Sequence, residues 1–223
     1  MKFRLSALVA ILLVAAPAAA QDSGPKVKFN FFEMTGGNLM IGKTFKIDAA
    51  YGAEKKLEVK APFRFIAPTS DEFLTRLQST EGKDTFVKIA YATLDKAFIE
   101  NFQFIPMNVA MREDEEDRIQ AAANLLATKA FDMVVQGYEK SKRDGVRKIK
   151  VGSYTAVEVF GRYVDPSVGL IYTWLVGILN PKQEHGVLMV ANVADKQLPL
   201  KNPDELKSKT RAGAMLSTFK YLD

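Results

Sequence analysis

Residues 154–193 decide the fold, because three apolar runs alternate there with two turn sequences. The runs are YTAVEVFGRYV (154–164), LIYTWLVGIL (170–179) and VLMVANV (187–193), and the turns are DPSVG (165–169) and NPKQEHG (180–186). Proline presets one backbone angle and glycine permits a left-handed residue, so both turns suit tight reversals of the chain. Short β-rich runs separated by such turns predict an antiparallel meander of three strands.

The middle run predicts a strand that is buried on both faces. Thr173 is the one polar side chain between Leu170 and Leu179. A strand with one solvated face alternates between apolar and polar residues, and this run does not. We therefore expect layers of structure on both sides of the meander.

Two helices are predicted to supply these layers. The first spans Arg112 to Ser141, with five carboxylates at Glu113–Asp117 in its first turns, as the helix dipole favours. Its apolar stripe is Ile119, Ala123, Leu126, Ala130, Met133, Val134 and Tyr138. The acidic run lacks the alternating ligands and the glycine of a calcium loop, so we interpret it as a solvated helix start.

The second helix follows Asn202-Pro203, which suit a cap and a first helical position. Its apolar stripe runs to the end of the chain through Ala212, Met215, Leu216, Phe219 and Leu222. The sequence thus predicts an α+β fold. An antiparallel sheet containing the three-strand meander is flanked by a long central helix and a C-terminal helix, as in an α/β/α sandwich.

The first part of the chain is predicted to be rich in strands. Lys26–Glu33 and Thr85–Leu94 alternate as strands do, and Phe98–Val109 contains Pro106, which favours an extended segment or an edge strand. Residues 44–50 and 56–60 are interpreted as a hairpin around Tyr51-Gly52-Ala53. Thr69 to Glu72 forms a capping-box pattern, which predicts a short helix through about Gln78.

Composition excludes several kinds of site. The chain has no cysteine and one histidine, which excludes Cys–His catalysis and the common zinc ligand sets. His185 is expected to be an exposed turn residue, and Trp174, Tyr172, Phe160 and Tyr163 are expected to belong to the core. We assign no catalytic residue, no cofactor and no metal ligand, although a pair of carboxylates brought together only by folding stays open.

One segment matches the phosphate-loop pattern G-x-x-x-x-G-K-[ST]. It is GNLMIGKT, Gly37 to Thr44. In a nucleotide site the backbone amides of such a loop hold phosphates, Lys43 reaches the terminal phosphates and Thr44 binds magnesium. A helix should open at Thr44, but the residues that follow are β-like, so we interpret the match as accidental.

The first twenty residues are typical of a cleaved signal peptide. Lys2 and Arg4 precede an apolar run from Leu5 to Ala15, and Ala18-Ala19-Ala20 is a small-residue cleavage site before Gln21. The mature chain, residues 21–223, carries 29 basic and 26 acidic residues without a basic cluster, so nucleic acid is not an expected partner. We expect a periplasmic protein without a transmembrane segment in the mature chain.

The part of the chain from residue 112 to residue 223 resembles the PsbP-like superfamily, which includes DcrB-like envelope proteins. The resemblance rests on a helix followed by Gly152–Val157, on the strand that runs to Gly161-Arg162-Tyr163, on two further strands, and on a closing helix that ends in Ser217-Thr218-Phe219. It implies an α/β/α sandwich and a non-catalytic module that binds partners. We expect one α+β domain over residues 21–223, with a strand-rich first part (21–110) and the PsbP-like part (112–223).

Three functions are compatible with these patterns. A non-enzymatic periplasmic binding or adaptor domain would have a solid core and an exposed apolar patch, and its partner would be an envelope protein. A carrier of a small apolar molecule or lipid would have an internal cavity ringed by Phe, Tyr and Met. A nucleotide-binding protein would have a helix directly after Thr44.

The signal peptide gives the first testable prediction. The intact mass of the protein isolated from its native host should correspond to a chain that begins at Gln21. A cytoplasmic pool that still carries Met1 would contradict export.

Overall fold

The computed structural model describes residues 27–30, 39–70, 72–78 and 85–223, and it arranges their strands in two antiparallel sheets. The larger sheet has the order β4-β5-β6-β10-β9-β8-β7 and the smaller sheet has the order β1-β2-β3-β11. Every pair of neighbouring strands is antiparallel. The predicted signal peptide and Gly36-Gly37 lie outside the described residues.

The elements have the following bounds. The larger sheet comprises β4 (Leu74–Gln78), β5 (Val87–Ala92), β6 (Phe98–Asn108), β7 (Glu139–Val151), β8 (Tyr154–Asp165), β9 (Gly169–Ile178) and β10 (His185–Ala194). The smaller sheet comprises β1 (Val27–Asn30), β2 (Leu39–Ile47), β3 (Phe63–Thr69) and β11 (Lys220–Tyr221). The helices are α2 (Ala49–Lys55), α3 (Glu115–Asn124), the π-helix η1 (Leu125–Ala130), α4 (Phe131–Val135), α5 (Asp204–Lys209) and α6 (Arg211–Thr218).

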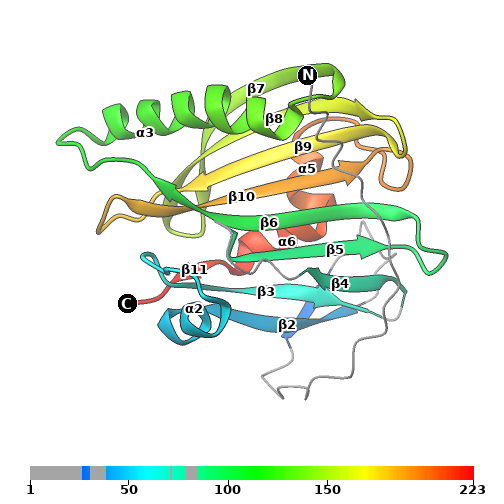
Figure 1. Ribbon diagram of the computed structural model, residues 1–223, viewed down its shortest axis with the longest axis horizontal. Helices are drawn as coiled ribbons and strands as arrows, with labels where there is room; N and C mark the ends of the chain where they lie inside the picture. Colours follow the sequence, from blue (N-terminus) through cyan, green and yellow to red (C-terminus); the bar gives the residue numbers. More distant parts are fainter. Residues whose placement is uncertain (1–26, 31–38, 71, 79–84) are drawn as a thin grey trace, which may run out of the picture.

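The larger sheet is the middle layer of the molecule. The helical run α3–η1–α4 packs on one face of β8 and β9, while α5, α6 and the smaller sheet lie on the other face (Figure 1). The three apolar runs of residues 154–193 are β8, β9 and β10, and β10 is the central strand of seven. Each layer therefore buries one face of these strands.

Strand β9 is buried on both faces, as its composition predicted. Leu175 belongs to the cluster beneath α3, whereas Trp174 and Val176 belong to the cluster on the opposite face. The hydroxyl of Thr173 is completely buried and donates a hydrogen bond to the carbonyl oxygen of Ala191. The aromatic residues Trp174 and Tyr163 are buried, as expected of core residues.

The predicted helix over residues 112–141 was too long at its C-terminal end. The helical run ends at Val135, Gly137 adopts a left-handed backbone with φ of 85°, and β7 then begins at Glu139. Strand β7 pairs with β8, so the meander has four consecutive strands and not three. The sequence hides β7 because it is an exposed edge strand, in which charged residues replace the apolar alternation and discourage pairing between molecules.

The π-helix explains why the apolar stripe of this helix was misassigned in its last turns. A π turn accommodates an additional residue and so rotates the residues that follow around the helix axis. Leu126 and Ala130 are buried as predicted, but Met133 is 67% exposed, and Phe131 and Val135 take the buried positions instead.

Two predictions in the first part of the chain are wrong. Residues 44–50 and 56–60 do not form a hairpin, because β2 pairs with β1 and β3, and α2 follows it. The side chain of Asp48 caps α2 by accepting a hydrogen bond from the amide of Tyr51 at 3.0 Å. The segment after Thr69 is not a helix either: β4 forms there because it pairs with β5, and this long-range pairing overrides the local capping pattern.

Strand β6 is an inner strand of the larger sheet and not an edge strand. It tolerates Pro106 because β5 begins only opposite Phe104 and no residue of β5 pairs with Pro106. The amide of Phe104 points toward β5, and by alternation the nitrogen of Pro106 points the same way, past the end of β5. The missing donor therefore breaks no hydrogen bond of the sheet.

The C-terminal segment forms two short helices and a strand where one helix was predicted. Helix α6 ends at Thr218, and Phe219 and Leu222 follow it in extended backbone. Strand β11 then pairs with β3, which brings the end of the chain into the smaller sheet. Phe219 is nonetheless 2% exposed, and its ring lies 5.4 Å from the ring of Phe63 and 5.0 Å from that of Tyr221.

A buried ion pair fixes the start of α6 on the larger sheet. Glu100 of β6 is fully buried and accepts hydrogen bonds from the backbone amide of Arg211 at 3.1 Å and from its guanidinium at 2.8 Å. The guanidinium lies 4.1 Å from the ring centre of Phe73. The carboxylate thus occupies the positive end of the helix dipole.

Phe219 allows a test of how the two sheets are joined. Phe219→Ala should lower the free energy of unfolding by about 3–5 kcal/mol, because it removes a buried aromatic ring between the sheets. Leu94→Ala is a matched control, since Leu94 is 63% exposed and its loss should change stability by about 0.5 kcal/mol or less. Equal denaturation midpoints for the two variants would show that Phe219 is not a core residue.

Candidate functional site

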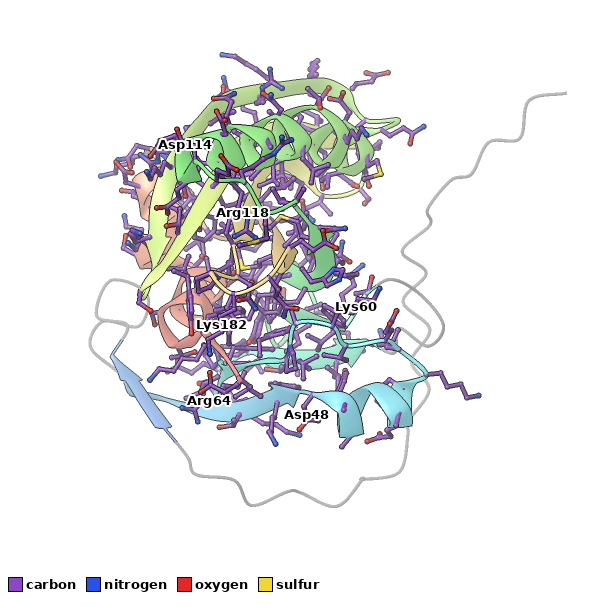
Figure 2. All side chains as sticks on the ribbon, turned by 90° about the vertical axis from the view of Figure 1, so that its left-hand side faces the viewer. Asp48, Lys60, Arg64, Asp114, Arg118 and Lys182 are labelled. Carbon is purple, nitrogen blue, oxygen red and sulfur yellow. The ribbon has the colours of Figure 1, made fainter. Side chains whose placement is uncertain are left out.

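Several loops meet at one end of the molecule, which we call the loop end. It comprises residues 57–61, 111–118, 150–155 and 179–186, which lie between α2 and β3, around the start of α3, at the β7–β8 turn and between β9 and β10. Figure 2 shows this end facing the viewer, with Asp114 and Arg118 above and Lys60 and Lys182 below. Two pockets of the described structure lie on the two sides of the β9–β10 loop.

Arg118 holds the β9–β10 loop in place. The side chain leaves the first turn of α3 and is 6% exposed. Its two terminal nitrogens donate hydrogen bonds to the carbonyl oxygens of Asn180 at 2.8 Å and Gln183 at 2.7 Å. Burial lowers the pKa of Arg118. The loop between two strands is therefore fixed by a cation from a helix on the next layer.

The β9–β10 loop is also fixed from the other sheet. The side-chain amide of Gln183 donates a hydrogen bond to the carbonyl oxygen of Lys60 at 3.0 Å, and Lys182 forms an ion pair with Asp223 at 2.7 Å. The backbone amide of Val109 donates to Glu184. The loop thus bridges both sheets and separates the two pockets.

The first pocket lies next to Arg118 and has a volume of about 420 Å³. Its charged residues come from the start of α3 and from β7. Of its hydroxyl residues, Ser153 lies in the β7–β8 turn, and Tyr154 and Thr155 begin β8. The complete lining is Met111, Arg112, Glu113, Glu115, Arg118, Lys150, Ser153, Tyr154, Thr155, Leu179 and Pro181.

A hydrogen-bond chain runs along the wall of this first pocket. Lys150 donates to the hydroxyl of Thr155 at 2.8 Å, and this hydroxyl donates to the carboxylate of Glu115 at 2.7 Å. The hydrogen bond from Thr155 lowers the pKa of Glu115, and the cations Lys150, Lys148 and Arg118 lower it further. Glu115 is therefore a stable carboxylate and does not have the raised pKa of a general acid.

The second pocket, of about 380 Å³, lies on the other side of the loop. His185 and Gly186 of β10, Phe86, Met107 of β6 and Lys60 are among the residues that line it. His185 is the first residue of β10 and is partly buried, so the prediction of an exposed turn residue was wrong. Its neighbour is Glu184, at 3.7 Å from Nε2.

The core between the sheets is filled by aromatic rings. The ring centres of Phe63, Phe65 and Phe104 are 4.7–6.2 Å apart, which is the spacing of packed aromatic pairs. The two pockets are open at the surface, and their linings mix charged and apolar residues. This arrangement does not favour the carrier of an apolar molecule, which needs an aromatic-lined cavity inside the protein.

The phosphate-loop match does not have the geometry of a nucleotide site. Leu39 to Thr44, six of its eight residues, lie in β2, where Lys43 pairs with Ala67 and Thr44 with Ile66 of β3. Backbone amides that form a sheet ladder do not converge on a phosphate group. Helix α2 begins only at Ala49, and Gly37 and Asn38 lie outside the described residues.

Other clusters of chemically active residues are structural. Glu158 is buried and accepts hydrogen bonds from the indole of Trp174 at 2.8 Å and from Arg147, which also pairs with Asp204. Among the residues that the structure describes, no three His, Asp or Glu side chains lie in the arrangement of a metal site. None of the helices in the described part has the length and apolar character needed to cross a membrane.

Sequence reasoning missed Arg118, which is the central residue of the loop end. The available signal was its position directly before Ile119, on the side of the helix that faces the sheet. A cation on the apolar face of a helix needs acceptors there, and the turn sequence NPKQEHG supplied the carbonyl oxygens.

Comparisons with known proteins identify the fold. Cyanobacterial PsbP from Synechocystis superposes with a TM-score of 0.50 at 11% identity, over 81% of this chain and 92% of that chain. The chain has a PsbP-like fold. The likeness extends beyond residues 112–223 into the first part of the chain, where the sequence alone showed none.

Two further solved structures are similar to this one. LpqN of Mycobacterium tuberculosis, a protein involved in cell envelope biogenesis, has a TM-score of 0.49 and 13% identity over 82% of this chain and 92% of that chain. The Ran-binding protein Mog1p of Saccharomyces cerevisiae has a TM-score of 0.44 and 10% identity over 82% and 97%. No protein-family model and no curated protein sequence matches the chain.

A substitution of Lys43 tests whether the phosphate-loop match is a nucleotide site or accidental. Its side chain is exposed, and its ammonium lies 5.6 Å from the ring centre of Phe45. Lys43→Ala should change the free energy of unfolding by no more than about 0.5 kcal/mol, as at an ordinary surface position. Millimolar ATP with magnesium should leave the melting temperature unchanged, whereas a micromolar site would add roughly 4 kcal/mol at a thousandfold excess. An ATP-dependent rise in melting temperature that Lys43→Ala abolishes would restore the nucleotide interpretation.

Proposed function

We propose that the protein is a non-enzymatic binding or adaptor domain of the periplasm, and that it binds an envelope protein through the loop end. The proposal rests mainly on how the β9–β10 loop is held in place. Arg118 fixes it to α3, Gln183 and Lys182 connect it to residues next to the strands of the smaller sheet, and an open pocket lies on each side of it.

A rigid loop between two pockets suits recognition of another protein. Binding costs less conformational entropy when the binding surface is ordered beforehand. The loop is held by side-chain hydrogen bonds to its backbone, and so its shape does not depend on the partner. The pockets offer space for side chains of the partner, and the exposed Met111 adds apolar surface at the rim of the first pocket.

The proposal assigns no chemical step to the loop end. Glu115 is held ionised by its neighbours, and the hydroxyl of Thr155 donates a hydrogen bond to that carboxylate, so neither is set up as an acid or a nucleophile. The signal peptide at residues 1–20 and the near-neutral charge of the mature chain support a periplasmic protein partner and not a nucleic acid.

Site-specific photo-cross-linking in the native host tests this proposal. A photo-reactive amino acid at Lys182, on the β9–β10 loop, should give a discrete cross-linked product with an envelope protein. The same amino acid at Lys196 is the control, because Lys196 is exposed and follows the opposite end of β10.

The outcomes of this experiment are distinct. A product at Lys182 that is absent at Lys196 supports binding through the loop end. Equal products at both positions, or none at Lys182, contradict it.

A further inference from the structure

The first pocket contains a buried cation, Arg118, that forms no direct ion pair with the residues that the structure describes. Glu115 of the same pocket acts on this cation only at longer range. The guanidinium of Arg118 bonds two carbonyl oxygens, and its Nε is buried without an acceptor. None of the ion pairs among the described residues includes Arg118, in contrast to Arg211, which is buried to a similar degree and pairs with Glu100. A buried charge is costly unless an opposite charge lies close to it.

The rest of the pocket adds further positive charge that is accessible. Arg112 and Lys150 line the same pocket and are exposed. The same lining also contains two carboxylates, Glu113 and Glu115, and Glu115 already accepts a hydrogen bond from Thr155. The lining therefore carries one more positive than negative charge, which matches a ligand with a single negative charge.

Apolar groups lie beside these charges. Leu179 is buried at the pocket wall, Met111 is 50% exposed at the pocket, and Tyr154 and Pro181 complete the apolar part of the lining. A volume of about 420 Å³ accommodates a terminal residue with its side chain and neighbouring peptide group. A small inorganic anion would leave this apolar surface uncovered.

We propose that the first pocket binds the free C-terminal carboxylate of a partner protein whose last residue is apolar. The carboxylate pairs with Arg112 and Lys150 at the opening and compensates the charge of Arg118 behind them, while the apolar side chain contacts Met111 and Leu179. Ser153 and Tyr154 are on the same lining. A phosphate with two negative charges fits less well, because Glu113 and Glu115 repel it. This inference rests on the proposed binding function and specifies its ligand.

An NMR titration with a defined peptide tests the proposal. The probe is acetyl-Phe-Leu with a free C-terminal carboxylate, added to ¹⁵N-labelled mature protein, with the C-terminal amide of the same peptide as the matched ligand. The free carboxylate should cause saturable shifts at the amides of Ser153, Thr155 and Lys182. The amide should bind at least about tenfold more weakly, because it lacks the negative charge.

Two protein variants test whether the peptide carboxylate binds in the first pocket. Arg112→Gln combined with Lys150→Gln should weaken binding of the free peptide at least about tenfold. Lys148→Gln is the control, because Lys148 lies two residues from Lys150 on β7 but pairs with Glu116 and does not line the pocket. Both side chains at the double variant are exposed, so the fold should be retained, as the remaining amide spectrum would confirm.

Several results would overturn the carboxylate proposal. The free and amidated peptides could bind equally well, or the free peptide could cause no saturable shifts up to about 20 mM, which is about the weakest affinity that such a titration measures. Lys148→Gln could weaken binding as much as the double variant does. Inorganic phosphate could bind more tightly than the peptide. If cross-linking at Lys182 succeeds while this titration fails, the binding function stands and the ligand assignment is wrong.

Discussion

The ion pair between Glu100 and Arg211 is the constraint on which the arrangement of the two sheets depends. Glu100 belongs to the large sheet, and Arg211 begins the helix that leads to β11 in the small sheet. Removing two charges from water costs several kcal/mol for each ion, so the pair is stable only because many hydrogen bonds compensate it. Glu100 accepts hydrogen bonds from the backbone amides of Arg211 and Ala212 and from the guanidinium of Arg211. The guanidinium also lies over the rings of Phe73 and Tyr91.

The position of α6 then determines how the sheets pack. Thr210 caps the helix through the amide of Gly213, and this glycine is needed because a Cβ there would lie 2.2 Å from the carbonyl oxygen of Lys207. The last turn presents Thr218, whose hydroxyl accepts a hydrogen bond from the amide of Ile66 in β3. Phe219 follows and fills the space between the sheets. With the interior filled in this way, open space for a ligand lies at the loop end.

At the loop end, too, a buried arginine connects a helix to the larger sheet, but no carboxylate of the described residues pairs with it directly. Arg118, like Arg211, is a buried cation that connects a helix to the sheet beside it. Arg211 has its carboxylate within the protein, whereas Arg118 has only carbonyl oxygens. This difference in charge compensation distinguishes a structural contact from a candidate binding site.

The sequence predicted the elements whose signals are local and apolar. Strands β8, β9 and β10 were found because Pro166, Gly169 and Pro181 mark the turns and the runs between them are continuously apolar. Strand β7 was missed because most of its side chains are exposed and many are charged, so no apolar alternation marks it. The helix at residues 69–78 was wrongly predicted because the capping pattern at Thr69 is local, whereas pairing of β4 with β5 is not.

The candidate site was hidden from sequence reasoning for a related reason. Its parts come from the start of α3, the β7–β8 turn and the β9–β10 loop, which are brought together only by the packing of layers. No motif marks Arg118, whose role depends on the carbonyl oxygens of Asn180 and Gln183, 62 and 65 residues further along the chain. The phosphate-loop match at Gly37 to Thr44 lies mainly in a strand.

Hydrogen exchange in Glu100→Gln tests most directly whether the buried ion pair holds the two sheets together. Gln keeps the shape of Glu100 but removes its charge, and breaking a buried pair costs about 3–5 kcal/mol when one partner is lost. Three backbone amides report on this junction: Ile66 donates a hydrogen bond to Thr218, Tyr221 to Tyr154, and Leu222 to Pro62. Their protection from hydrogen exchange should fall at least about tenfold in the variant, which is equivalent to roughly 1.4 kcal/mol. Amides of the β8–β9 pair should keep theirs. Unchanged protection at the three amides, or an equal loss throughout the large sheet, would contradict the account.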